Sequence, residues 1–362
     1  MDPRIRQHAE IVVDHSIDLQ EGDDVMIVAP PVAEDLVVAL HEVIGDRGAN
    51  PLYLNSSDRA KRAYLRAHDG EFETPGHRMA LVEEADAYIR VRADENATEQ
   101  SDVPPEQVAA YSKARQPIQE ERLSKRWCLT QYPAPGNAQL AEMSTEAYEN
   151  FVWDAVTKDW DEQREFQEHL VEILDPADEV RIESGEETDL VLSVDGMRTL
   201  NDYGEANLPG GEVFTAPVPD SVEGTVRFDK PLYHRGREIE NAFLEFDGGE
   251  VVDHEATKNE ALLGEVLDTD EGARRLGELG IGMNRDIDRF TYNMLFDEKM
   301  GDTVHLAIGM AYDECVGEDQ EGNDSAVHLD MIVDMSEDAR IVVDGETIQR
   351  DGTFRFEDGF DG

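Results

Sequence analysis

The stretch DVMIVAPPVAEDLVVALHEVIGDRGANPLYL, residues 24–54, sets the fold of the first half of the chain. Its first six residues form a short apolar run, which is typical of a buried strand. After two prolines, apolar residues recur at helical spacing over residues 32–44, and two glycines end that pattern. Residues 51–54 form a second apolar run. This order of strand, helix and strand predicts neighbouring strands in a layered, mainly parallel α/β sheet.

The alternation of strands and helices continues beyond residue 54. The expected elements are a helix over 57–66, a strand over 87–91, a charged helix over 107–125 and a strand over 127–132. Between 145 and 175, apolar and aromatic residues at helical spacing predict further helix, with the aromatic rings packed in a core. We therefore expect an α/β domain over residues 1–180.

The pattern changes after about residue 180. Short runs of alternating apolar and polar residues are separated by Gly, Asp and Asn, which predicts antiparallel strands. The expected strands are 180–182, 189–194, 224–228, 242–246, 303–308, 340–343 and 353–356. We therefore expect a second, α+β domain over residues 181–362, and the residues that suggest chemistry fall within it.

The chain is strongly acidic along its whole length. Its 362 residues include 83 Asp and Glu against 32 Lys and Arg, a net charge of −51. Binding to nucleic acid or to an anionic membrane depends on cationic side chains, so neither partner is expected. A surface of this kind repels itself in dilute buffer, and molar salt screens that repulsion. The composition therefore predicts a protein from a salt-adapted organism.

Two further features bear on location. Cys128 and Cys315 lie far apart and form no CxxC motif, which suits a reducing compartment. The first residues, MDPRIRQHAE, lack the apolar segment of a signal peptide, and no window of the chain is long and apolar enough for a transmembrane helix. The expectation is a cytoplasmic protein.

Histidine is scarce, and one of the ten lies in an unusually apolar setting beside a carboxylate. The segment SAVHLDM, residues 325–331, places His328 and Asp330 on one face if it is a strand, because strand side chains repeat every two residues. An imidazole and a carboxylate side by side form a usable pair of metal ligands. A hydrogen-bonded pair with a structural role explains the same spacing.

Three more candidates stand in similar apolar sequence. His305 lies within TVHLAIG, where a core histidine is the simpler explanation; Glu212 follows a Pro-Gly-Gly turn; and Glu278 lies within LGELGIG. Each glutamate could be an ordinary turn residue. In a chain that keeps most acids on its surface, however, an acid in apolar sequence is informative, because a buried carboxylate needs a cation or strong hydrogen bonds.

Together these three carboxylates and two imidazoles exceed what one tetrahedral ion needs. They suit two divalent ions about 3.5–4 Å apart with one bridging carboxylate, an arrangement that activates water for hydrolysis, most simply of an amide. Neither cysteine has the spacing of a structural zinc site. Two other functions fit the same residues: another dinuclear metallohydrolase, such as an amidase or phosphoesterase, and a metal-stabilised binding protein without catalytic activity.

Four blocks of the second half resemble the aminopeptidase T family of thermophilic metalloproteases, a group of leucyl aminopeptidase type. They are NLPGGEVFTAP at 207–217, LGELGIGMN at 276–284, FDEKMGDTVHLAIGMAY at 296–312 and SAVHLDM at 325–331. The resemblance implies a two-domain homodimer that removes single residues from the N-termini of peptide substrates. It also implies a site for two divalent ions, which can be zinc, cobalt, manganese or magnesium.

Carried over by position, the family's ligands fall on the same five residues, and the resemblance adds Tyr312 at the metals. It implies that the phenol of Tyr312 ligates weakly or steadies the oxyanion. Our leading interpretation is that Glu278 or Glu212 moves the proton to the leaving amine, with the bridging role and the general-base role left open between them. Two departures concern substrate preference. Leu329 stands where the family often has an aromatic residue, and the usual Gly-Gly-Asn is reduced to Gly322-Asn323.

Overall fold

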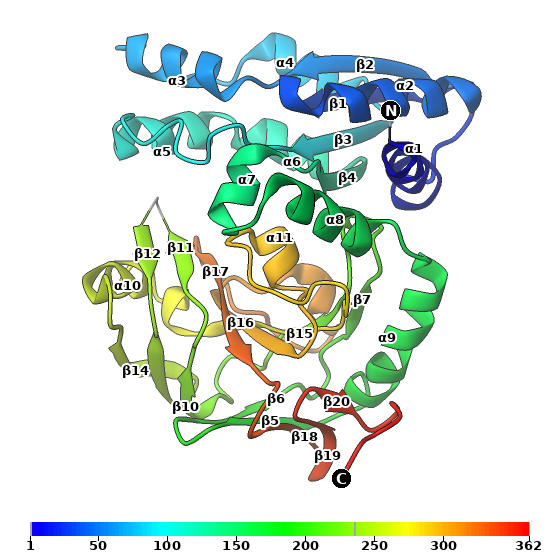
Figure 1. Cartoon of the computed structure of the whole chain (residues 1–362). Coiled ribbons are helices and arrows are strands. Elements are labelled where there is room, and N and C mark those ends of the chain that lie inside the picture. Colours follow the sequence, from blue (N-terminus) through cyan, green and yellow to red (C-terminus); the bar gives the residue numbers. More distant parts are fainter. Residues whose placement is uncertain (1, 235–236, 362) are drawn as a thin grey trace. The chain divides into compact units, whose positions relative to one another are not determined.

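The computed structural model describes residues 2–234 and 237–361, and the chain divides into two compact units (Figure 1). The first unit comprises the chain up to Lys158 together with Gly204–Gly210; the second comprises Asp159–Tyr203 and the chain from Gly211 onward. The expected boundary after residue 180 places two segments differently from this division. Helix α9 (Trp160–Leu174), which contacts β7 and β9, belongs to the second unit, and Gly204–Gly210 belongs to the first.

The first unit is built on a five-stranded parallel sheet with the order β2-β1-β3-β4-β8. Its strands are β1 (Asp24–Ala29), β2 (Asn50–Asn55), β3 (Ala87–Arg92), β4 (Arg126–Gln131) and β8 (Asn207–Leu208). The first four fall where the sequence predicts strands. The fifth joins the sheet from far along the chain, and no local pattern predicts it.

Helices cover both faces of this sheet. The helical segments of this unit are α1 (Pro3–Glu10), a π-helix (Ile11–Ser16), a 3-10 turn (Pro31–Ala33), α2 (Glu34–Asp46), α3 (Asp58–Ala67), α4 (Gly76–Glu83), α5 (Pro105–Ala114), α6 (Gln116–Leu123), α7 (Pro135–Leu140) and α8 (Thr145–Val156). Met26 and Val28 of β1 pack with Val82 of α4 and Ile118 of α6, whereas the alternate residues of β1 face α2. Burial on both faces explains why β1 is an almost unbroken apolar run.

Two of the expected helices are too long. The helix predicted over 107–125 is two helices, α5 and α6, which meet at Arg115. Pro117 has no backbone N–H to continue the helical ladder, but a proline is well tolerated in the first turn of a new helix. Likewise, residues 145–175 form α8 and α9, and Asp159 caps the second of these by accepting from the N–H groups of Asp161 and Glu162.

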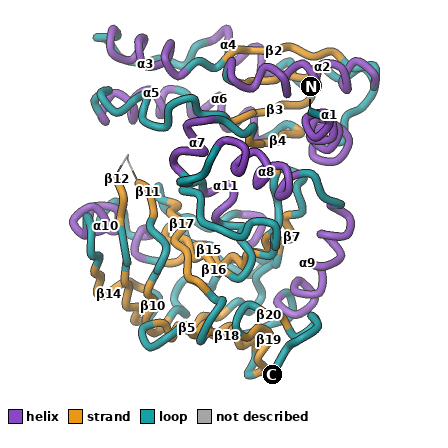
Figure 2. The backbone as a smooth tube through the Cα atoms, viewed as in Figure 1, coloured by secondary structure: helices purple, strands orange, loops and turns teal. Residues whose placement is uncertain are grey.

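The second unit is rich in strands (Figure 2), and these strands pair antiparallel in both of its large sheets. Its eight-stranded sheet has the order β14-β13-β10-β6-β5-β18-β19-β20, and its five-stranded sheet has the order β17-β16-β15-β9-β7. The strands of the first are β5 (Glu179–Ser184), β6 (Thr188–Ser193), β10 (Glu223–Arg227), β13 (Phe243–Asp247), β14 (Glu250–Glu255), β18 (Ala339–Val343), β19 (Glu346–Arg350) and β20 (Thr353–Phe354).

The smaller sheet carries the candidate residues. Its strands are β7 (Leu200–Asp202), β9 (Glu212–Thr215), β15 (Leu276–Gly282), β16 (Thr303–Gly309) and β17 (His328–Asp334). A hairpin of β11 (Leu232–His234) and β12 (Arg237–Ile239), helices α10 (Glu260–Leu267) and α11 (Met294–Asp297), and 3-10 turns at Gly272–Arg274 and Asp313–Cys315 complete the unit. The antiparallel second half that the sequence predicts is thus confirmed.

A large apolar core lies within the second unit, which also has a small separate cluster of Met197, Ala216, Ala311 and Cys315. The large core joins side chains of both sheets to those of α9 and α10, among them Leu170, Ile182, Leu263, Leu306 and Met331, each fully buried or nearly so. Because the core takes one face of the smaller sheet, that sheet's other face is free to carry polar groups. Among the described residues, no helix has the length and apolar character needed to cross a membrane.

Candidate metal centre

The candidate residues lie on four adjacent strands of the smaller sheet. Glu212 begins β9, Glu278 lies on β15, His305 on β16, and His328 and Asp330 on β17. In the strand register, Glu278 pairs with Ala307, which in turn pairs with Asp330. This places Glu278 and Asp330 on the same face, two strands apart, with only the small alanine between them.

The two histidines are on neighbouring strands, as their apolar sequence settings suggest. On β17, Leu329 and Met331 belong to the apolar core, which leaves His328 and Asp330 on the opposite face. Their spacing predicts that these two share a face, and the strand geometry agrees with it. Glu278 is not a turn residue but the third residue of a fully buried strand.

Glycines of the LGELGIG segment make room for an imidazole. Gly280 of β15 pairs directly with His305 of β16, and a Cβ atom at Gly280 would lie 2.0 Å from Cε1 and Nε2 of the His305 ring. Any side chain there would displace the ring. A similar constraint precedes Glu212, because a Cβ at Gly211, whose φ is +120°, would lie 2.4 Å from Cβ of Asn284.

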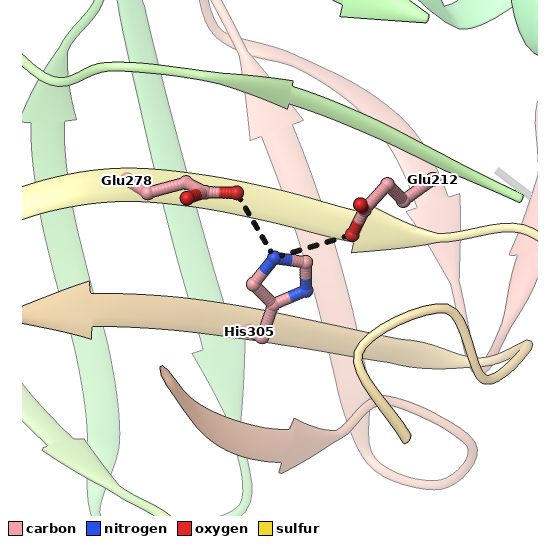
Figure 3. Close-up of side chains that lie close together, drawn as sticks. All are labelled: Glu212, Glu278 and His305. Atoms are coloured by element: carbon pink, nitrogen blue, oxygen red, sulfur yellow. Dashed lines mark hydrogen bonds and ion pairs between the residues drawn. The ribbon is translucent and has the colours of Figure 1, made fainter. Parts of the chain in front are cut away.

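The five side chains form two overlapping triads. In the first triad, Nε2 of His305 lies 3.3 Å from Oε1 of Glu278 and 3.4 Å from Oε2 of Glu212, so the ring stands between the two carboxylates (Figure 3). In the second triad, Nε2 of His328 lies 3.2 Å from Oε2 of Glu278 and 3.4 Å from Oδ1 of Asp330. Glu278 belongs to both triads and offers one oxygen to each.

The first triad is the more deeply buried. Glu212, Glu278 and His305 are buried, and the His305 side chain is only 1% exposed. The side chains of His328 and Asp330 are 18% and 17% exposed. Solvent and substrates therefore reach the second triad more readily than the first.

The pKa values show that this cluster favours positive charge. Although burial alone would lower the pKa of His305, Glu278 and Glu212 raise it to about 9, and Asp330 and Glu278 raise that of His328 to about 11. Burial favours neutral Glu278, yet hydrogen bonds with both histidines lower its pKa to about 2. Burial raises the pKa of Glu212 to about 8.

The cluster also passes a test of fit for a metal ion. Oε2 of Glu212 and Nδ1 of His305 are buried and make no hydrogen bond within the described part of the chain. A buried polar atom without a hydrogen-bond partner destabilises the fold, and a cation bound between the ligands would satisfy Oε2 of Glu212. Carboxylate oxygens and imidazole nitrogens are ligands of zinc, manganese and related divalent ions.

The second triad has support from the backbone. Nδ1 of His328 lies 2.9 Å from the carbonyl oxygen of Met310 and can donate a hydrogen bond to it. That bond fixes the ring with Nδ1 toward the backbone and Nε2 toward Glu278 and Asp330, so that Nε2 is the nitrogen that would bind a metal ion in place of its proton. The ring is thus oriented as a metal ligand, with its nitrogen already directed at the carboxylates.

Tyr312 lies at the edge of the site rather than within a triad. It follows β16, is 40% exposed, and its ring centroid is 4.9 Å from that of His328. Burial of its hydroxyl and the nearby Glu278 and Asp330 carboxylates raise its pKa, so the phenol keeps its proton. It can therefore donate a hydrogen bond to a group bound at the second triad.

Sequence reasoning missed three charged residues at this site. Lys299 is fully buried, and its Nζ lies 2.9 Å from Oε1 of Glu212, contacts Oε1 of Glu298, and lies 3.5 Å from Oδ2 of Asp202. A signal was present, since Lys299 is one of only seven lysines and lies in FDEKMGD, just before the strand of His305. The rarity of lysine could have singled it out.

Comparison with known proteins identifies the family of the chain. The family model described as thermophilic metalloprotease (M29) matches residues 1–358. The chain is 30% identical to Aminopeptidase 2 of Geobacillus stearothermophilus, over 97% of each chain, and 29% identical to Aminopeptidase T of Thermus thermophilus, over 95% of this chain and 94% of that one.

Solved structures give the same result. The structure of wild-type AmpT from Thermus thermophilus is similar, with a TM-score of 0.87 and 26% identity over 98% of this chain and 99% of that one. A 2,5-dihydroxypyridine dioxygenase from Pseudomonas putida shares the fold alone, at a TM-score of 0.63 and 15% identity over 99% of each chain. By its family match over nearly the whole sequence, this chain belongs to the thermophilic metalloprotease (M29) family.

Proposed function

We propose that this metal-dependent aminopeptidase works with two divalent ions, one held by Glu212, Glu278 and His305 and the other by Glu278, His328 and Asp330. The relatives named above are aminopeptidases, and the family is one of metalloproteases. The observation that supports a site for two metal ions is the position of Glu278, which directs one carboxylate oxygen toward each triad.

The charges of the site support two ions rather than one. Five carboxylates lie in the two triads or next to them, and one buried ammonium group, that of Lys299, contacts three of the five. The carboxylates are those of Asp202, Glu212, Glu278, Glu298 and Asp330. If all five are ionised, two divalent ions with that ammonium would balance their charge, whereas one ion would leave two negative charges in excess.

Each residue of the site has a proposed role in hydrolysis. Bound divalent ions lower the pKa of water and polarise a carbonyl oxygen. Glu278 faces both histidines, so we assign it the bridging role. One oxygen of Glu212 is held by Lys299 and the other lies in the first triad, so we assign transfer of the proton to the neighbouring carboxylate of Glu298. The more exposed second triad receives the substrate's first peptide bond, and Tyr312 donates a hydrogen bond from its hydroxyl to the developing oxyanion.

The test measures metal content and peptide hydrolysis together. Protein stripped with a chelator is assayed for release of N-terminal residues from short peptides, before and after addition of zinc, cobalt, manganese or magnesium. We expect two ions per chain and activity that depends on them. Activity that persists without metal, or the absence of any activity with all four ions, would contradict the proposal.

The same preparation tests the two alternatives from the sequence. A different metallohydrolase would cleave simple amides or phosphate esters but not peptides, and a binding protein would gain thermal stability from metal without any hydrolysis. The metal's identity is part of the proposal, since imidazole with carboxylate suits zinc, cobalt and manganese better than magnesium.

Three expectations stay predictions: a cytoplasmic location, a homodimer, and adaptation to high salt. The last is the most direct to test. Because the net charge of −51 is spread over the chain, we expect the midpoint of thermal unfolding to rise steadily from millimolar to molar KCl, as screening weakens the repulsion between acidic side chains. A midpoint that does not change with KCl would contradict adaptation to salt.

A further inference from the structure

We propose that Lys299 is a positioning residue, which holds the carboxylate of Glu212 in the orientation that binds a metal ion and so sets the affinity of the first triad alone. This inference rests on the proposed metal centre. It concerns a residue that belongs to neither triad and contacts no other candidate ligand than Glu212.

Lys299 is unusual first for its burial. Its side chain is 0% exposed, although lysine almost always keeps its ammonium group in water. Removing an ammonium ion from water costs several kcal/mol unless good partners replace the solvent. Here the partners are three carboxylates, those of Glu212, Glu298 and Asp202, so the ammonium is well compensated.

The contact between Lys299 and Glu212 gives the two carboxylate oxygens of Glu212 different partners. Oε1 accepts a hydrogen bond from Nζ of Lys299 at 2.9 Å. Oε2 makes no hydrogen bond within the described residues and lies 3.4 Å from Nε2 of His305, inside the first triad. By binding one oxygen, Lys299 directs the other toward the position a metal ion would take. Ligating carboxylates in metal sites are held by outer partners in this way.

The main chain at Glu212 is already fixed by another residue. Nε2 of Gln167, from helix α9, donates to the carbonyl oxygen of Glu212 at 3.0 Å and to that of Asp202 at 3.0 Å. The freedom left to Glu212 is rotation of its side chain. Lys299 is the group that removes this freedom, because its ammonium is the hydrogen-bond donor to Oε1.

The second triad does not depend on Lys299. The ring of His328 is oriented by the carbonyl of Met310, 2.9 Å from Nδ1, whereas Nδ1 of His305 in the first triad makes no hydrogen bond to any residue that the structure describes. The two triads therefore have separate supports. Loss of Lys299 should weaken one ion and leave the other in place.

The test is a titration of metal-free protein with Co²⁺, followed by absorption and by calorimetry, for the parent protein and Lys299→Met. Methionine keeps the length and apolar stem of lysine but has no charge. We expect two binding steps in the parent protein. In the variant we expect one step to weaken about 10–100-fold, the range seen when an outer partner of a ligand is removed, and the other to keep its affinity.

A matched control is Lys230→Met. Lys230 also forms an ion pair with a carboxylate of the metal-bearing sheet, Asp334 at 2.7 Å, but lies outside both triads. This variant should keep both steps unchanged. A similar loss in both variants would show a general effect of charge and overturn the inference, as would equal weakening of both steps in Lys299→Met or no weakening at all.

Removing one buried cation could prevent folding, so a second variant is needed. The double variant Lys299→Met/Glu298→Gln removes a positive and a negative charge together and leaves Glu212 without its donor. It should show the same selective loss of one step. If the parent protein itself binds no cobalt, the proposed metal centre fails; if it binds two ions and both variants bind them equally well, only the role of Lys299 fails.

Discussion

Two fully buried histidines, one in each unit, show how neighbours decide what burial does to an imidazole. His8 on α1 is 0% exposed, its Nε2 lies 2.7 Å from Oγ1 of Thr130, and its ring centroid lies 5.5 Å from that of Trp153. Burial lowers the pKa of His8 to about 3, so the ring is neutral. His305 is buried to the same degree, yet Glu278 and Glu212 raise its pKa to about 9.

The contrast teaches that a buried histidine by itself does not mark a site. The contacts of His8 are a hydroxyl and an aromatic ring, neither of which carries a negative charge, so burial alone lowers its pKa. The environment of His305 offers carboxylates, which stabilise a positive charge whether a proton or a metal ion supplies it. The predictions below change these neighbours one at a time.

The largest effect should come from replacing Glu278 with glutamine. Glu278→Gln removes the charge shared by both triads while keeping the shape of the side chain. Without it, the setting of His305 becomes more like that of His8, so both ions should bind poorly and peptide hydrolysis should fall below detection. Metal content per chain and peptide release are the measurements. Two tightly bound ions in this variant would contradict the bridging role.

A smaller loss is expected when the space for the imidazole is removed instead of the charge. In Gly280→Ala the new methyl group would occupy the position of the His305 ring, 2.0 Å from two of its atoms. We expect the ion of the first triad to bind at least about tenfold more weakly, as for other changes that misorient a ligand. Gly45→Ala, in helix α2 with nothing within 4 Å of the added atom, is the control.

At the exposed end of the site, Tyr312→Phe should lower kcat by about 10²–10³-fold, the usual cost of one lost oxyanion donor, and leave metal content unchanged. The reason is that Tyr312 contacts the His328 ring rather than a carboxylate, and its raised pKa keeps the hydroxyl a donor. Tyr233→Phe, at another exposed tyrosine, is the control. Loss of metal instead of kcat would make Tyr312 a ligand.

Much of the site could be predicted because its ionisable side chains lie within apolar stretches of sequence. Glu278 and His305 are ionisable residues inside apolar runs, and such residues need partners to be buried. Lys299 was missed because it precedes β16 in a short polar stretch, where a lysine is expected to be exposed. Its burial comes from the three carboxylates that surround it, and these are brought together only by the folded chain.

For the fold as well, features set by local sequence could be predicted, and features set by contacts between distant residues could not. The strands β1 to β4 were predictable because each is a compact apolar run between turn residues. The two-residue strand β8 was not, because its pairing with β4 joins residues about 80 positions apart and leaves no local pattern. The start of α1 was marked, however, by Asp2 as its cap and Pro3 in its first turn, a signal that sequence reasoning did not use.

The smallest effect concerns His8, the histidine without carboxylates. Because its pKa is about 3 in the folded protein against the 6.5 of an unperturbed histidine, its neutral form contributes fully to stability above pH 6.5, and this contribution is lost as pH falls from 6.5 toward 3. His8→Asn should leave hydrolysis and metal content unchanged and cost about 1–2 kcal/mol at neutral pH, as core changes of this size do. Its unfolding free energy should then fall less steeply than the parent's between about pH 6.5 and 4. Equal slopes in urea unfolding across that range would mean that His8 is protonated in the folded state, and the contrast with His305 would disappear.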